Sequence, residues 1–207
     1  MDPLTAPYFP IIYVRGYAMT ANEIADTVAT PYMGFNLGST KVRQAWDGTV
    51  RRHVFESPLV RLMKDYGYRD TYTDGSEIDG ELPARSVVIY RYYETADTDL
   101  GDGKVLSIVE AATGLRDLIR KLRDQVCGAD AARKKAFRVY LIAHSMGGLV
   151  CRSFLQNDKI STGADRAMVD KVFTYATPHN GIEMAGFNVP AALGLWEMNN
   201  FNRKTMA

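Results

Sequence analysis

Four short and almost continuous apolar runs are spread along the chain. Each is four to six residues long and rich in β-branched or aromatic side chains. The runs are Ile11–Val14, Val87–Tyr90, Val139–Ala143 and Lys171–Ala176. Because none of them alternates apolar with polar residues, the pattern predicts strands that are buried on both faces of a parallel sheet.

Helical periodicity separates the later runs. Apolar residues recur at steps of three and four from Val105 to Val126, which predicts one apolar stripe on a helix of about six turns. Gly128 is placed to end that helix. A shorter apolar face runs from Leu149 to Leu155. The alternation of strand and helix predicts the α/β class, with a doubly wound and mostly parallel sheet joined by right-handed crossovers.

The composition of the chain limits which partners the protein can bind and where in the cell we expect it. The 207 residues include 25 basic and 24 acidic ones, so a net charge of +1 does not favour nucleic acid as a partner. The apolar runs fall well short of the roughly 20 residues that a membrane span requires. The N-terminus shows no basic region followed by an apolar one, so we see no signal peptide and expect a cytoplasmic location. Cys127 and Cys151 are interpreted as free thiols packed like small apolar residues.

We expect one domain over residues 1–207, with two stretches that break the alternation. Residues 20–85 contain a helix candidate at Ser57–Tyr66 and a long polar loop, and we predict an atypical insertion or a cap-like connection there. Residues 189–198 form an apolar piece that contains Trp196. This piece is either a lid over an apolar substrate or an ordinary packed helix.

The third apolar run leads directly into Ala143-His144-Ser145-Met146-Gly147, and a helix pattern begins at once. Such a turn strains one residue and projects its side chain above the carboxyl end of the strand. Neighbouring backbones require small residues two positions before and after it, as Ala143 and Gly147 are. We therefore interpret Ser145 as a catalytic nucleophile. The alternative is a serine that only caps the helix.

The backbone after Ser145 is suited to stabilise an oxyanion. The amide of Met146 would point to the place where a tetrahedral oxyanion forms, and the helix N-terminus adds partial positive charge. Acyl transfer of this kind requires no cofactor and no metal. Residues 70–81 only faintly resemble a calcium-binding loop, because Tyr72 occupies a position that requires an oxygen ligand.

Three segments resemble those of the α/β-hydrolase lipases and esterases, a group that includes triacylglycerol lipases and inositol-deacylase-like proteins. Residues 144–150 with Arg152 resemble the nucleophile elbow of that family. Residues 10–17 resemble its strand followed by His-Gly-aromatic, with Arg15 in place of His, and this implies that Tyr17 gives the second oxyanion amide. Residues 174–181 resemble its Thr-Pro-His-x-Gly segment. The resemblance implies an α/β-hydrolase fold that acts on a small-molecule ester or a lipid.

The base and its carboxylate are harder to assign. In this fold they follow the serine in the order Asp or Glu, then His. His179 is the only histidine after Ser145, and it is our candidate base, although the resemblance gives its motif a structural role. We consider His53 and His144 weaker candidates. The carboxylate that partners His179 would be one of Asp158, Asp165, Asp170 and Glu183.

Our preferred hypothesis is that these residues form the N-terminal part of a larger catalytic domain and lack the C-terminal strands of that domain. A C-terminal segment beyond Ala207 would then complete the site. The strand order of this topology would place residues 11–17 between 87–93 and 138–144, with the site above the carboxyl ends of the strands. Two alternatives stay open: a thioesterase, amidase or acyltransferase of the same fold, and a binding or scaffold protein without a complete triad.

Overall fold

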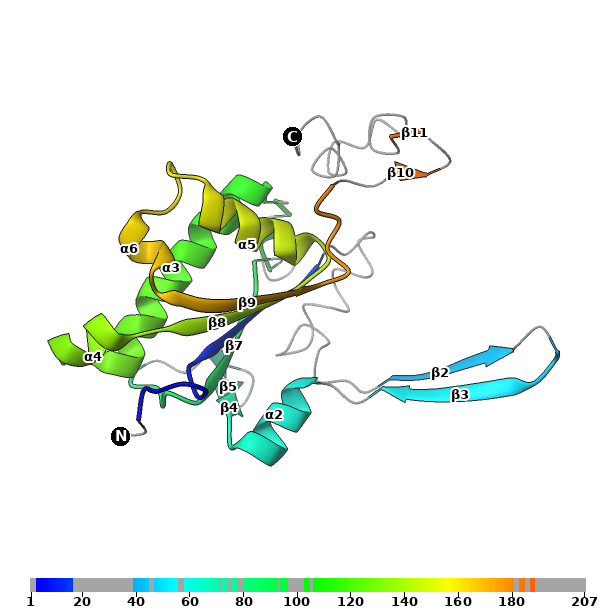
Figure 1. Cartoon of the computed structure of the whole chain (residues 1–207), viewed down its shortest axis with the longest axis horizontal. Coiled ribbons are helices and arrows are strands. Elements are labelled where there is room, and N and C mark those ends of the chain that lie inside the picture. Colours follow the sequence, from blue (N-terminus) through cyan, green and yellow to red (C-terminus); the bar gives the residue numbers. More distant parts are fainter. Residues whose placement is uncertain are drawn as a thin grey trace.

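The centre of the molecule is a parallel five-stranded sheet (Figure 1). The computed structural model describes residues 3–16, 39–44, 47–55, 58–70, 72–73, 76–77, 80–92, 94–96, 103–104, 106–180, 183–184 and 187–188. The strands lie in the order β4 (Arg69–Asp70), β7 (Ser86–Tyr90), β1 (Ile11–Val14), β8 (Val139–His144) and β9 (Val169–Tyr175). This order confirms the predicted class and places residues 11–14 between the two expected neighbours.

Helices α3 (Ile108–Cys127) and α5 (Met146–Gln156) lie on one face of the sheet, and α2 (Pro58–Tyr66) lies toward the other (Figure 1). The capping box of Ser107 and Glu110 starts α3, so the helix begins at Ile108 and not at Val105 as the periodicity predicted. Gly128 ends α3 as predicted, with φ of 57° and its amide bonded to the carbonyl of Asp124. The short helix α4 (Ala131–Ala136) follows.

The core lies between α3, α5 and the sheet. All four residues of β1 are buried. From its second turn the apolar stripe of α3 is buried as predicted, at Ala112, Leu115, Ile119, Leu122 and Val126. In the first turn the prediction is wrong for Val109, which is 53% exposed. Phe154 of α5 is fully buried against the same cluster. Cys127 and Cys151 are free and buried, which confirms that they are packed thiols, and burial raises the pKa of Cys151 to about 12.

The prediction that every strand is buried on both faces is wrong for β9. Val172 is 37% exposed and Phe173 is 64% exposed. In the described part of the sheet β9 is an edge strand, as β4 is on the opposite side, so it has a partner strand on one side only. Strand β8 alternates buried and half-buried residues, because α3 and α5 cover only one face of this half of the sheet.

Residues 20–85 depart from the strand–helix alternation. Strands β2 (Ser39–Gln44) and β3 (Val50–Phe55) form an antiparallel hairpin that extends away from the main sheet (Figure 1). The predicted helix follows as α2, one residue shorter than expected. Two more small hairpins are formed by β5 (Tyr72–Thr73) with β6 (Ser76–Glu77), and by β10 (Glu183–Met184) with β11 (Phe187–Asn188). The prediction that residues 20–85 act as a cap is not tested by the structure. Residues 189–198, predicted to form a lid or a packed helix, lie outside the described residues.

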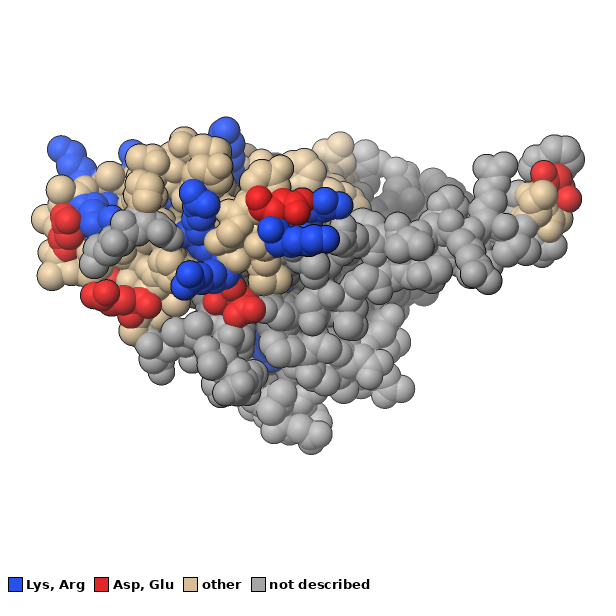
Figure 2. Space-filling model, turned by 90° about the horizontal axis from the view of Figure 1, so that it is seen from below, with Lys and Arg blue, Asp and Glu red and all other residues tan. Residues whose placement is uncertain are grey.

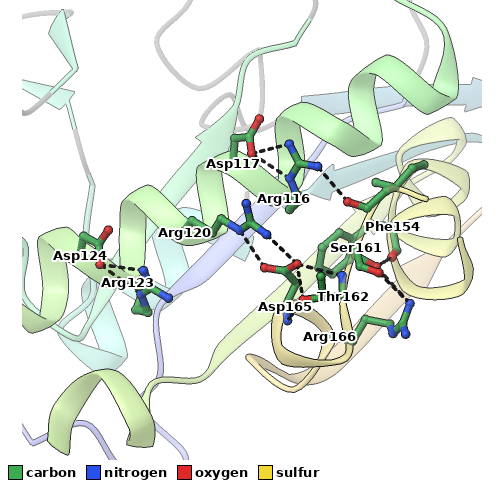
Figure 3. Close-up of polar contacts among 11 residues, drawn as sticks. Arg116, Asp117, Arg120, Arg123, Asp124, Phe154, Ser161, Thr162, Asp165 and Arg166 are labelled. Atoms are coloured by element: carbon green, nitrogen blue, oxygen red, sulfur yellow. Dashed lines mark hydrogen bonds and ion pairs between the residues drawn. The ribbon is translucent and has the colours of Figure 1, made fainter. Parts of the chain in front are cut away.

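An ion pair between an exposed arginine and a buried aspartate joins helix α3 to the connection between α5 and β9. The guanidinium of Arg120 makes two bonds of 2.8 Å to the carboxylate of Asp165, on the short helix α6 (Gly163–Arg166) (Figure 3). The same carboxylate accepts from the amide and hydroxyl of Thr162. Arg120, and then Thr162, hold the pKa of Asp165 well below its usual range against the opposing effect of burial.

The described surface mixes charges of both signs. In Figure 2 basic and acidic side chains are interspersed over the described part of one face. Within the described ranges, no helix combines the length and the apolar character needed to cross a bilayer.

Candidate active site

Ser145 lies at the junction of β8 and α5, in a conformation that is rare for any residue except glycine. Its φ is 50° and its ψ is −125°. Its side chain makes no capping hydrogen bond to the helix that begins at the next residue, so the alternative of a helix-capping serine is wrong. The residue is half-buried. A strained serine at this position, with its hydroxyl not used for capping, is the geometry that a nucleophile elbow requires.

Close backbone contacts explain the small residues around Ser145. A β-carbon on Gly147 would collide with the carbonyl oxygen of Val14 and would lie 2.7 Å from that of Arg15. A β-carbon on Gly148 would collide with the side chain of Thr177. Helix α5 can therefore start beside the end of β1 only because residue 147 lacks a side chain, and beside the loop after β9 only because residue 148 lacks one.

The segment that follows β1 lies directly against the nucleophile. A β-carbon on Gly16 would be 2.5 Å from Cβ of Ser145. The hydroxyl of Tyr92 donates to the carbonyl of Arg15 over 2.8 Å. Tyr17 lies outside the described residues, so its role as an oxyanion donor stays a prediction. Met146 is the first residue of α5, and amides in the first turn of a helix have no partner within that helix.

The end of β9 supports the turn from the other side. The amide of Ser145 donates to the carbonyl of Tyr175 over 3.0 Å. The next residue, Ala176, has φ of 52°, a second strained non-glycine residue beside the elbow. Burial raises the pKa of Tyr175 to about 12, so its phenol is neutral at pH 7. Two strained residues on adjacent strand ends agree with the clustering of backbone strain at functional sites.

His144, the residue before Ser145, packs against Tyr175 at the end of β9. Its ring lies 4.9 Å from that of Tyr175. Burial, and then the positive charge of Arg15, lower the pKa of His144 below its ordinary value, so the ring is neutral at pH 7. Among the described hydrogen bonds none joins His144 to Ser145.

His179 is held in the loop after β9. Its amide donates to the carbonyl of Thr177, and its own carbonyl accepts from Arg152 over 2.9 Å. Its Nε2 lies 3.4 Å from Oγ1 of Thr174, and the ring lines a cavity of about 350 Å³ between α5 and β9. No hydrogen bond of the described residues joins it to Ser145. These contacts order the loop, and the assignment of His179 as the base stays a prediction.

Among the carboxylates proposed to partner His179, those whose side chains are described either pair with an arginine or lie far from Ser145. Arg120 binds Asp165, and Arg166 binds Asp158 over 2.8 Å. Asp170 lies near the start of β9, whereas Ser145 follows the carboxyl end of the adjacent strand. The side chain of Glu183, like that of His53, lies outside the described residues. In the described ranges no group of three or more His, Cys, Asp and Glu side chains could hold a metal ion.

The parallel sheet, its strand order and the strained serine between β8 and α5 define an α/β domain of the hydrolase type. Residues 93–189 match the family model of the PGAP1-like alpha/beta domain. A search of the curated proteins found no match to the chain.

The solved structures that are similar to the chain include a lipase and a second protein of the hydrolase type. The first is the mature lipase BlEst2 of Bacillus licheniformis, with 14% identity, a TM-score of 0.39, and coverage of 99% of this chain and 60% of the lipase. The second is a protein of Lactobacillus plantarum WCFS1 proposed to be a cell surface hydrolase, with 17% identity, a TM-score of 0.25, and coverage of 85% and 56%. The chain thus spans about 60% of the length of the lipase it matches.

Proposed function

We propose that the protein is a serine hydrolase that cleaves carboxylic ester bonds, of the lipase or esterase kind, through an acyl intermediate on Ser145. The observation that carries this proposal is the strained conformation of Ser145 at the start of α5, with a hydroxyl that caps nothing. The close approach of Gly16 to the same residue supports it, because a hydrolytic serine requires amide donors beside it.

The reaction has two steps. Oγ of Ser145 attacks the ester carbonyl carbon while its proton passes to a base, and amides of Met146 and Tyr17 stabilise the oxyanion. The carbon–oxygen bond to the alcohol then breaks, and the alcohol leaves with the proton from the base. Water, deprotonated by the same base, attacks the acyl-serine and releases the acid and the free serine. No cofactor or metal takes part in this scheme.

We propose that the base and its carboxylate come from a segment outside the described residues, a C-terminal segment that completes the sheet. In the described sheet β9 has a partner strand on one side only, so a further strand can pair with its other side. His179 is the second candidate for the base. If neither the C-terminal segment nor His179 supplied the base, only the rate acceleration from the oxyanion site and from substrate binding would remain.

The substrate in this proposal is a small-molecule ester or a lipid, and a cytoplasmic location stays a prediction. A thioesterase, amidase or acyltransferase would use the same serine. A binding or scaffold protein would retain the fold without turnover. Rates on matched p-nitrophenyl esters, thioesters and anilides separate the enzyme classes, since an esterase cleaves the ester fastest.

Substitution of the nucleophile tests the proposal. We expect Ser145→Ala to abolish hydrolysis of a p-nitrophenyl ester, a loss of about 10⁴-fold or more if the base is present. The matched control is Ser153→Ala on the same helix, which should retain the activity of the unaltered protein. Full esterase activity in folded Ser145→Ala would overturn the proposal.

A further inference from the structure

We propose that Tyr92 is a positioning residue, whose hydroxyl holds the segment Arg15–Gly16 against the nucleophile so that the oxyanion amides stay in register with Ser145. The inference rests on the proposed function and deepens it. Neither the nucleophile motif nor the family resemblance includes residue 92.

Tyr92 is buried just beyond the end of β7. Only 5% of the residue is exposed, and its ring packs beside that of Tyr90 at 5.1 Å. Its hydroxyl donates to the carbonyl of Arg15, a residue 77 positions away in sequence. Removal of this hydrogen bond is costly, because the carbonyl of Arg15 would lose a donor at a partly buried position.

Arg15 is in turn packed from a second side. Its carbonyl faces α5, where a β-carbon on Gly147 would lie 2.7 Å away. Gly16 follows at once and abuts Cβ of Ser145. Because β1 ends at Val14, Arg15 lies beyond the strand. The bond from Tyr92 is therefore a tertiary restraint on the residue before the one that touches the nucleophile.

This restraint has a chemical consequence. The amide that the family resemblance assigns to the oxyanion site belongs to the peptide bond between Gly16 and Tyr17. That bond is planar, so the backbone of Gly16 sets the direction of its N–H. Oxyanion donors act only when their geometry is arranged in advance, and a displacement of about 1 Å reduces catalysis strongly.

Tyr90 provides a matched control within the same segment. Its hydroxyl donates to the carbonyl of Ala111 on α3 over 2.7 Å, so it anchors the helix and not the β1 segment. Tyr90→Phe and Tyr92→Phe each remove one phenol hydroxyl, and with it the hydrogen bond described for that hydroxyl, and each keeps the ring. The two variants therefore differ in which backbone segment is released.

The experiment compares kcat and KM for a p-nitrophenyl ester, and the rate of labelling by a fluorophosphonate probe, in the two variants. For Tyr92→Phe we expect kcat and labelling to fall about tenfold while KM stays within about twofold. For Tyr90→Phe both should stay within about twofold of the unaltered protein. Thermal unfolding establishes that both variants fold. Equal kinetics in the two variants would overturn the inference.

Hydrogen exchange at the amide of Gly16 gives a readout that does not depend on turnover. Exchange should be faster in Tyr92→Phe than in Tyr90→Phe, because only the first variant releases this segment. Absence of labelling in folded, unaltered protein that carries the proposed C-terminal segment would defeat the proposed function. Equal Gly16 exchange in both variants would defeat the positioning role of Tyr92, whatever the activity.

Discussion

Gly147 on α5 packs directly on the carbonyl groups at the end of β1, and a β-carbon at position 147 would lie 2.7 Å from the carbonyl oxygen of Arg15. This contact joins the helix that follows the nucleophile to the segment that borders it. The same segment touches Cβ of Ser145 through Gly16. The geometry of the candidate site thus depends on one close helix–strand contact.

A methyl group at position 147 should disrupt this contact. We expect Gly147→Ala to lower the free energy of unfolding by about 2 kcal/mol, because the obstructing atoms are backbone carbonyls that cannot rotate away. Labelling of Ser145 should also slow. In the control Gly163→Ala the new β-carbon meets no atom within 4 Å, and stability should stay equal or rise by up to about 1 kcal/mol. Urea unfolding measures both, and equal effects would contradict the account.

The ion pair between Arg120 and Asp165 should contribute more to the free energy of unfolding than the exposed ion pair between Arg123 and Asp124 on α3. The side chain of Asp165 is 5% exposed, so Arg120→Ala leaves a carboxylate poorly solvated, at a cost of about 2 kcal/mol. Arg123 pairs with Asp124, whose side chain is 51% exposed, and Arg123→Ala should cost about 0.5 kcal/mol or less. Urea midpoints test the difference. An equal cost for the two substitutions would mean that burial does not strengthen the first pair.

His144 should make the protein less stable in mild acid. Burial, and then Arg15, lower its pKa in the folded protein, so the unfolded chain binds a proton more readily. Its contribution to stability is complete above its ordinary pKa of 6.5, and it is lost as the pH falls from there through the lower folded pKa. His144→Gln cannot titrate, so the free energy of unfolding should fall less steeply below pH 6.5. Parallel stability–pH curves for the two proteins would contradict this.

Two phenylalanines should differ sharply in their contribution to the free energy of unfolding. Phe154 is fully buried, whereas Phe173 on β9 is 64% exposed. We expect Phe154→Ala to cost about 4 kcal/mol of stability. Phe173→Ala should cost less than about 1 kcal/mol. A cost of several kcal/mol for Phe173→Ala, measured by urea unfolding, would show that this side chain is covered in solution.

Local patterns were enough to predict much of the fold. The apolar runs predicted β1, β7, β8 and β9, because continuous β-branched residues identify strands without any tertiary information. The stripe of α3 was predicted for the same reason. Strand β4 was not predicted, since two residues have no periodicity. The exposure of β9 depends on its neighbours in the sheet, which its own residues do not encode.

In the candidate site, too, local features could be predicted from the sequence and contacts between distant residues could not. Ser145 and its small neighbours were predicted, because a strand, a strained turn and a helix follow one another within a few residues. The bond from Tyr92 to Arg15 was not predicted, because it joins residues 77 positions apart. Outside the site, the bond from Arg120 to Asp165 was missed for the same reason, since it joins residues 45 positions apart. Charge and aromatic patterns do not indicate such partners.

The most direct test of the account is the site of covalent labelling by a fluorophosphonate probe, mapped by peptide mass spectrometry on the folded protein. A nucleophile on a strained turn beside oxyanion amides should form one adduct, on the peptide that contains Ser145, and Ser145→Ala should form none. An adduct on another serine, or none on folded protein completed by its proposed C-terminal segment, would contradict the claim that Ser145 is a catalytic nucleophile.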